Sequence, residues 1–184
     1  MDQQHIQKAV RACEAGGVIA YPTEAVYGLG CLPMNENAVL RILELKGRSV
    51  EKGLIVVAED IAQIHAYVDF SQVPDMQVIE DTWPGPYTWL VPAREETPKW
   101  LTGEHTTLAV RISENPVVRA LCKELGPIVS TSANPQSSEP ARSSAQVGTY
   151  FSGQIDYIVP GNITASLNPS EIRDAISGNV VRTA

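Results

Sequence analysis

Short apolar runs alternate with amphipathic segments along this chain, and that alternation constrains its fold more than any other feature. Apolar residues recur at helical spacing over 3–15, 35–45 and 115–125. Runs of strand length lie between and after them, at 18–21, 54–57, 88–91, 108–112, 128–129, 157–159, 171–173 and 180–182. Interleaved helices and strands predict an α/β sheet flanked by helices. The closely spaced late strands predict a mixed rather than a purely parallel sheet.

Capping residues support the three longer helices. Asn35 is a plausible N-cap, Asn115-Pro116 opens a helix, and glycines follow two of the helical segments at 16–17 and 126. Two shorter helices are expected at 59–66 and 74–81.

Length and composition favour one globular domain over residues 1–184. The chain is long enough for one substantial core and barely long enough for two. Its 43% hydrophobic and 19% charged residues are ordinary for a folded domain. No apolar run approaches the ~18 residues of a membrane span, and the first five residues lack the basic and apolar regions of a signal peptide. We therefore expect a cytoplasmic protein without membrane contacts.

The net charge of −7 disfavours a chain that coats itself on nucleic acid, although it leaves room for a local basic groove. Three widely spaced cysteines form no CxxC pair, so we expect buried free thiols and neither a zinc site nor a disulfide framework. The three histidines show no metal-ligand spacing either.

Two polar segments mark a candidate binding site. Ser130-Thr131-Ser132-Ala133-Asn134 follows an apolar strand, and its hydroxyls and amide can bind a ligand without adding charge. Lys46-Gly47-Arg48 ends a helical segment, where the cations either complement the helix dipole or hold a phosphate group. Together the two segments suggest a pocket for an anionic small molecule such as a nucleotide.

Other polar residues allow two interpretations each. Thr23, after the first strand, either belongs to an ordinary turn or hydrogen-bonds a substrate; no phosphate-loop motif is present. Arg111 lies inside an apolar strand and needs a carboxylate partner or an anionic ligand, and Arg182 raises the same question. The turn at 83–88 either packs as an aromatic anchor or walls a pocket, and Glu51 and Lys52 are expected to be solvated surface.

Six segments in this order resemble the YrdC/TsaC family of bacterial threonylcarbamoyl-AMP synthases. They are YPTEAVYGLG at 21–30, KGR at 46–48, WPGPYT at 83–88, LAVRI at 108–112, STSAN at 130–134 and NPSEIRD at 168–174. The resemblance covers nearly the whole chain and is closest to the short, single-domain form of the family. It implies a twisted α/β sheet around a deep, positively charged cleft.

The resemblance also implies an activity: L-threonine, bicarbonate and ATP, with Mg²⁺ entering as Mg-ATP, give threonylcarbamoyl-AMP and pyrophosphate. This adenylate would supply a tRNA-modifying transferase complex of the TsaB, TsaD and TsaE type. That complex modifies the adenosine beside the anticodon of ANN-decoding tRNAs.

The family's KxR and SxN signature falls on four residues of this chain, implied to be catalytic and nucleotide-binding: Lys46, Arg48, Ser132 and Asn134. By the same resemblance, Thr23 and Arg111 hold threonine, Ser130 orients carbamate and phosphate, and Ser170 and Arg182 help to hold the nucleotide or adenylate. The assignment is chemically coherent, because two anionic reactants must be brought together and cations offset their repulsion.

The chain departs from the family pattern at four positions, and two other functions remain open. Gly53 and Val57 stand where many relatives carry a proline and a histidine, Ser138 replaces a glycine, and Glu171 replaces a threonine. One alternative is a factor that binds double-stranded RNA or acts in ribosomal RNA maturation, an association this family carries. The other is an unrelated nucleotide hydrolase, which would consume ATP without threonine.

Overall fold

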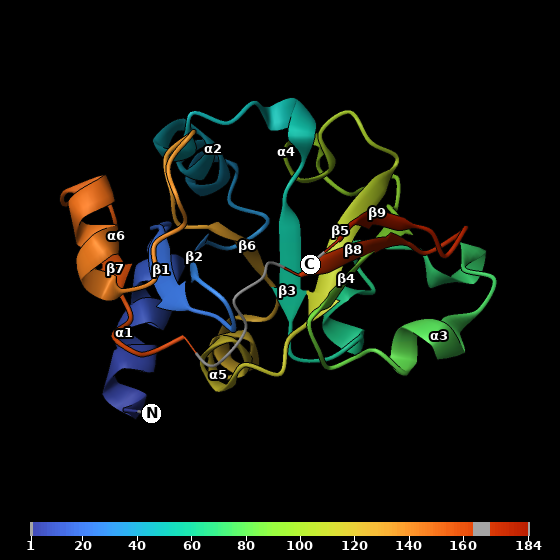
Figure 1. The fold of residues 1–184 in the computed structure, drawn as a ribbon, viewed down its shortest axis with the longest axis horizontal. Coiled ribbons are helices and arrows are strands. Elements are labelled where there is room, and N and C mark those ends of the chain that lie inside the picture. Colours follow the sequence, from blue (N-terminus) through green and yellow to red (C-terminus); the bar gives the residue numbers. More distant parts are fainter. Residues whose placement is uncertain (1, 164–169, 184) are drawn as a thin grey trace.

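The computed structural model describes residues 2–163 and 170–183, and these residues form one mixed sheet with helices packed against it (Figure 1). The α-helices are α1 (Gln3–Glu14), α2 (Glu36–Lys46), α3 (Met76–Glu80), α4 (Lys99–Thr102), α5 (Pro116–Leu125) and α6 (Ser144–Phe151). Short 3₁₀ turns lie at Val50–Lys52, Ala62–Ile64 and Phe70–Gln72. The predicted caps are confirmed, since Asn35 accepts from the N–H of Ala38 and Asn115 from that of Val117.

The strands are β1 (Ile19–Pro22), β2 (Tyr27–Gly30), β3 (Ile55–Ala58), β4 (Tyr87–Pro92), β5 (Thr107–Ile112), β6 (Ile128–Ser132), β7 (Tyr157–Ile158), β8 (Glu171–Asp174) and β9 (Val180–Arg182). Their order is β7-β1-β2-β6-β3-β5-β4-β8-β9. Three neighbouring pairs are parallel, namely β1–β7, β3–β5 and β4–β8, and the other five are antiparallel. The predicted mixed α/β sheet is confirmed.

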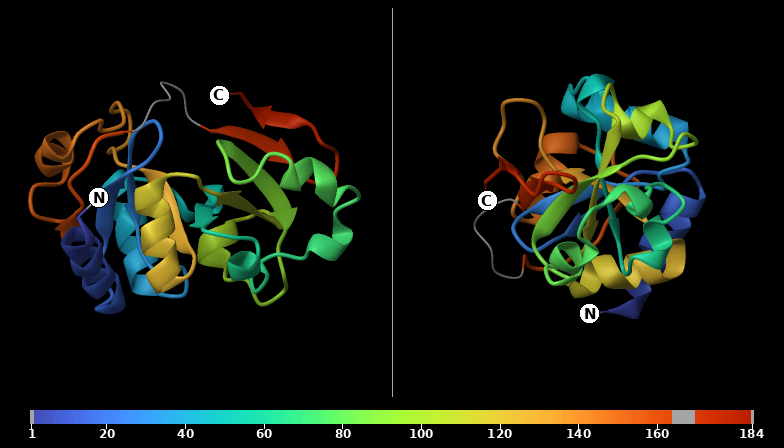
Figure 2. Two further views of the ribbon diagram at one scale, coloured as in Figure 1. Left: turned by 90° about the horizontal axis from the view of Figure 1, so that it is seen from below. Right: turned by 90° about the vertical axis from the view of Figure 1, so that its right-hand side faces the viewer.

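Strand alternation builds a core on each side of the sheet. In β1, Ile19 and Tyr21 pack with α1 and α5, whereas Ala20 packs with the cluster that contains residues of α2 and α6. Figure 2 shows α1 and α5 side by side, and β8 and β9 at the other end of the molecule. All three cysteines are buried free thiols, as predicted.

Several expected elements need correction. Residues 59–66 do not form a helix; only a single 3₁₀ turn is present there. The segment read as a turn after the first strand contains β2, and Ser130, Thr131 and Ser132 belong to β6 rather than to a loop after it. Helices α4 and α6 were not expected. Among residues 2–163 and 170–183, no helix is long and apolar enough to cross a membrane.

Candidate functional site

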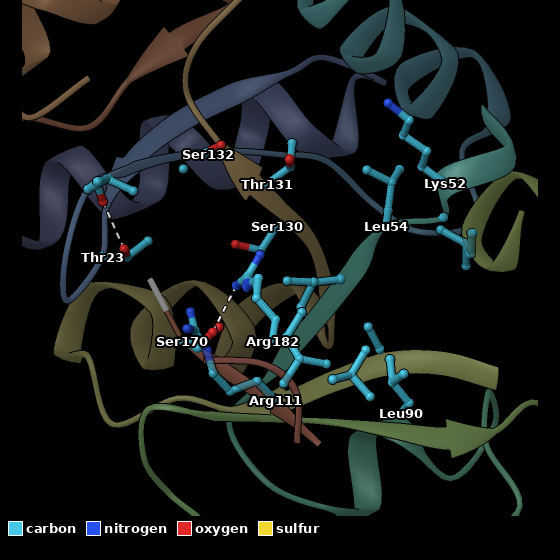
Figure 3. Close-up of a pocket in the computed structure, with 18 of the residues that line it drawn as sticks. Thr23, Lys52, Leu54, Leu90, Arg111, Ser130, Thr131, Ser132, Ser170 and Arg182 are labelled. Atoms are coloured by element: carbon cyan, nitrogen blue, oxygen red, sulfur yellow. Dashed lines mark hydrogen bonds between the residues drawn. The ribbon is translucent and has the colours of Figure 1, made fainter. Parts of the chain in front are cut away.

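A cavity of about 430 Å³ is lined by polar side chains from strands across the sheet, from β6 through β5 to β9. Figure 3 shows Arg111, Ser130, Ser170 and Arg182 gathered at its centre, with Thr23 and Ser132 on one wall. Its lining comes from separate parts of the chain and includes Thr23, Glu24, Gly28, Arg48, Lys52, His105, Arg111, Ser130, Thr131, Ser132, Ser170 and Arg182. The structure therefore brings together most of the residues that the sequence singled out.

Strand β6, which lies between β2 and β3, carries three hydroxyl side chains that line the cavity: Ser130, Thr131 and Ser132. Its first residues, Ile128 and Val129, are fully buried in the core, and its polar end faces the cavity. Ser132 pairs with Gly28 of β2, and Ser130 pairs with Ile55 of β3. Because a strand is hydrogen-bonded on each side, these hydroxyls are held at fixed positions.

Lys46 is the last residue of α2, and its side chain contacts the end of β6. Gly47 adopts a left-handed conformation at φ 60°, which closes the helix. The Lys46 ammonium donates to the carbonyl oxygens of Ser132 and Asn134, the latter at 3.0 Å, and to Asn134 Oδ1 at 3.1 Å. Burial, and then the nearby Arg48, lowers the Lys46 pKa to about 8.

Lys46 and Asn134 are not among the described residues that line the cavity. Asn134 also donates to the carbonyl oxygen of Ser138 at 2.8 Å and accepts from Ser132 Oγ at 2.6 Å. Lys46 and Asn134 thus hold the turn after β6 in place. Ser132 is hydrogen-bonded to both of them and itself lines the cavity.

Arg48 faces the cavity directly. Its guanidinium donates to the carbonyl oxygen of Gly53 at 3.0 Å, whereas its buried Nε has no hydrogen-bond partner. Burial lowers its pKa. A buried donor without a partner indicates a place for a ligand oxygen.

Arg111 has the carboxylate partner that its sequence position required. Its guanidinium lies 3.4 Å from Glu24 Oε2, and the two side chains are 11% and 12% exposed. Ser113 Oγ donates to the other oxygen, Glu24 Oε1, at 2.6 Å. Glu24 was not singled out from the sequence, although it follows Thr23 directly; the signal was the unpaired buried arginine.

Thr23, Ser170 and Arg182 complete the site. The buried Thr23 donates its hydroxyl to the carbonyl oxygen of Val26 at 2.7 Å, so that Oγ1 can still accept. Arg182 donates to the carbonyl oxygen of Ser170 at 2.8 Å. Arg182, Arg111 and Arg48 all line the cavity. Partial burial, followed by the charges of Arg111 and Arg48, lowers the pKa of Arg182.

Two further segments were interpreted from sequence. The turn at 83–88 packs as an anchor, because Trp83 is 8% exposed and belongs to the core, yet Pro86 also lines the cavity. Lys52 is exposed as expected and in addition lines the cavity. Residues 168–169 of the segment 168–174 lie outside the described residues.

Comparison with known proteins identifies similar chains. The model of the Sua5/YciO/YrdC family, described as "Telomere recombination", matches residues 11–184. A threonylcarbamoyl-AMP synthase of Pseudomonas fluorescens Pf-5 is 50% identical over 179 residues, which is 96% of either chain. One of Pseudomonas aeruginosa UCBPP-PA14 is 50% identical over 180 residues, covering 97% of this chain and 96% of that one.

Solved structures of similar proteins share this fold. P. abyssi Sua5 complexed with L-threonine has a TM-score of 0.86 at 31% identity, covering 95% of this chain. This chain spans only 52% of that longer protein. E. coli YciO has a TM-score of 0.84 at 29% identity, covering 98% of this chain and 89% of its own.

Proposed function

The chain belongs to the Sua5/YciO/YrdC family, and we propose that it is a threonylcarbamoyl-AMP synthase. The observation that carries this proposal is the 50% identity, over 96% of both chains, to a relative bearing that name. The reaction is a nucleotidyl transfer in which L-threonine, bicarbonate and ATP give threonylcarbamoyl-AMP, pyrophosphate and water.

The cavity's charge supports this chemistry. Threonine carbamate and ATP are both anions, so bringing a carbamate oxygen to the α-phosphorus requires that their repulsion be offset. Arg48, Arg111 and Arg182 surround the space where this occurs. As the new O–P bond forms and the bond to the pyrophosphate oxygen breaks, fixed cations stabilise charge on the phosphoryl oxygens. No covalent protein nucleophile is needed.

Neutral groups orient the reactants in this proposal. The serine hydroxyls of β6 hydrogen-bond carbamate and phosphate oxygens, while Thr23 and Arg111 hold threonine. Lys46 and Asn134 act behind them, by fixing the turn that places Ser132. The L-threonine complex of P. abyssi Sua5 supports a threonine site in this fold.

The remaining partners follow from the proposed reaction. Mg²⁺ arrives with ATP as part of the substrate and keeps several of its waters. The adenylate then passes, in the cytoplasm, to a tRNA-modifying transferase complex of the TsaB, TsaD and TsaE type.

The test is pyrophosphate release from Mg-ATP with threonine and bicarbonate omitted in turn. We expect release only when both are present. Release that is indifferent to threonine would replace the synthase with an ATP hydrolase of another purpose.

A further inference from the structure

Glu24 is the one carboxylate among the described residues that line the cavity, whose charged side chains are otherwise cations. It lines the cavity, yet two of the three reactants in the proposed synthesis, ATP and bicarbonate, are anions. An additional carboxylate raises the electrostatic cost of binding ATP or bicarbonate. Its presence therefore calls for a partner of opposite character.

The Glu24 side chain is held in place from behind. Ser113 is fully buried; its hydroxyl donates to Glu24 Oε1 at 2.6 Å and accepts from the N–H of Asn115 at 3.1 Å. Asn115 is also the N-cap of α5. The carboxylate is thus tied to the start of a helix, which fixes where its second oxygen points.

That second oxygen has no hydrogen-bond partner among the described residues. Glu24 Oε2 lies 3.4 Å from the Arg111 guanidinium and accepts no hydrogen bond, although it is buried. Arg111 Nε is likewise buried without a partner. One ion pair between two residues that line the cavity therefore holds both an unused acceptor and an unused donor, and buried polar groups are seldom left unpaired.

An α-amino acid complements both atoms at once. Its amino nitrogen donates hydrogen bonds, and its carboxylate accepts them from a neighbouring group. A divalent cation fits less well, because it would lie beside the Arg111 guanidinium without an anion of its own to satisfy Arg111 Nε. The paired open atoms thus favour a zwitterion over a metal ion or a simple anion.

We infer that Glu24 is a specificity-determining residue whose Oε2 accepts from the amino nitrogen of threonine, while Arg111 Nε donates to the threonine carboxylate. This inference rests on the proposed function. Ser113 is the positioning residue that keeps Glu24 Oε2 turned toward the ligand. Because the carbamate retains one N–H, the contact persists after the amino group has reacted with bicarbonate.

The experiment compares two ligands by calorimetry in the absence of ATP. L-threonine is set against 3-hydroxybutanoate of matching configuration, which keeps the carboxylate and hydroxyl but lacks the amino group. Wild-type protein should bind threonine about 10- to 100-fold more tightly. Glu24→Gln should reduce this ratio to below about 3-fold by weakening threonine alone. In pyrophosphate release, it should raise KM for threonine without raising that for ATP.

Two variants complete the design. Glu59→Gln is the matched control, since Glu59 also pairs with an arginine, Arg119 at 3.2 Å, but does not line the cavity. Its ligand ratio should equal that of the wild type. Ser113→Ala, which leaves the Glu24 carboxylate in place but unheld, should lower the ratio in the same direction, and it carries the test if Glu24→Gln does not fold.

Three outcomes would overturn the inference: equal binding of the two ligands by the wild type, no measurable binding of threonine by it, or an equal loss of both ligands in Glu24→Gln. The last would mean that Glu24 only orients Arg111. Retained discrimination in a wild-type protein that releases no pyrophosphate would instead overturn the proposed function alone, because binding is measured without catalysis.

Discussion

Neighbouring cations of the Lys46-Gly47-Arg48 segment differ in what they touch. Lys46 is 6% exposed and donates to acceptors of Ser132 and Asn134. Arg48 lines the cavity and keeps a free buried Nε. In the proposed function, the positive charge therefore acts through the protein at Lys46 and on the ligand at Arg48.

Alanine variants should separate these two roles. Arg48→Ala should cost ~2–4 kcal/mol of transition-state stabilisation, about 30- to 1,000-fold in kcat/KM, with little change in stability. Lys46→Ala should lose as much activity and also ~1–3 kcal/mol of folding free energy, because its acceptors lose their donor. Pyrophosphate release and urea unfolding measure the two quantities. Lys123→Ala, an exposed lysine of α5, is the control. A loss of less than tenfold for both variants would contradict the assignment.

The lowered pKa of Lys46 predicts a pH effect. Between pH 7 and 9 the ammonium, with a pKa of about 8, loses its charge, so pyrophosphate release should fall through that range. Stability should change in the opposite sense. The unfolded lysine, at its ordinary 10.5, binds more protons than the folded one, and the Lys46 contribution to stability therefore rises from about pH 8 to 10.5.

A pH–rate profile at saturating threonine and bicarbonate checks this. Lys46→Met should retain a low activity without the inflection near pH 8. An inflection of the same position and size in that variant would assign it to another group.

The sequence predicts most residues of this site but not the contacts that they make with each other. Arg111 required a partner because a charge inside an apolar strand is costly, and that physical demand pointed to the site. The identity of the partner depended on the approach of residues 24 and 111, which only the folded chain reveals. For the same reason, sequence reasoning did not reveal that Lys46 lies behind Ser132.

At the level of elements, local signals predicted helix ends well and β2 not at all. Asn35 and Asn115 cap helices through contacts within a few residues, which sequence shows directly. The β2 sequence YGLG contains two poor strand formers, and pairing with β1 on one side and β6 on the other overrides that preference. The segment 59–66 has a similar local contact, since Asp60 Oδ1 accepts from the N–H of Gln63 at 3.1 Å, yet only a 3₁₀ turn forms there, so a cap alone did not decide the helix.

Two glycine substitutions should have opposite signs. Gly47→Ala places a side chain at φ 60° and should cost ~1–2 kcal/mol of unfolding free energy. Gly148 lies within α6 with nothing within 4 Å of an added Cβ, so Gly148→Ala should stabilise by ~0.5–1 kcal/mol. Urea unfolding of both variants tests this. Equal effects would show that the backbone conformation at 47 does not decide the cost.

At the level of the whole molecule, local charge opposes net charge. The chain carries −7 overall, yet three arginines, Arg48, Arg111 and Arg182, line one cavity. The net charge alone disfavours the binding of polyanions. Composition does not show where the fold places the basic residues, and the structure gathers three of them in one cavity.

This separation predicts a salt effect. Mg-ATP at about 100 times its Kd should raise the unfolding free energy by ~2.7 kcal/mol, and added NaCl should weaken that binding. Adenosine, which is uncharged, is the matched ligand and should lose little affinity. Thermal shifts at low and high NaCl measure both. An equal salt effect on the two ligands would remove the arginines from nucleotide binding.

The central place of β6 has a dynamic consequence. Its backbone is bonded to β2 on one side and β3 on the other, so freeing it requires opening two ladders at once. In hydrogen–deuterium exchange, its amides should be among the slowest to exchange in the chain. Strand β9, which brings Arg182 to the cavity, is exposed and, within residues 2–163 and 170–183, pairs with β8 alone. We therefore expect β6 to stay fixed while β9 opens readily, so that, in the proposed function, motion during turnover concentrates at the edge that carries Arg182.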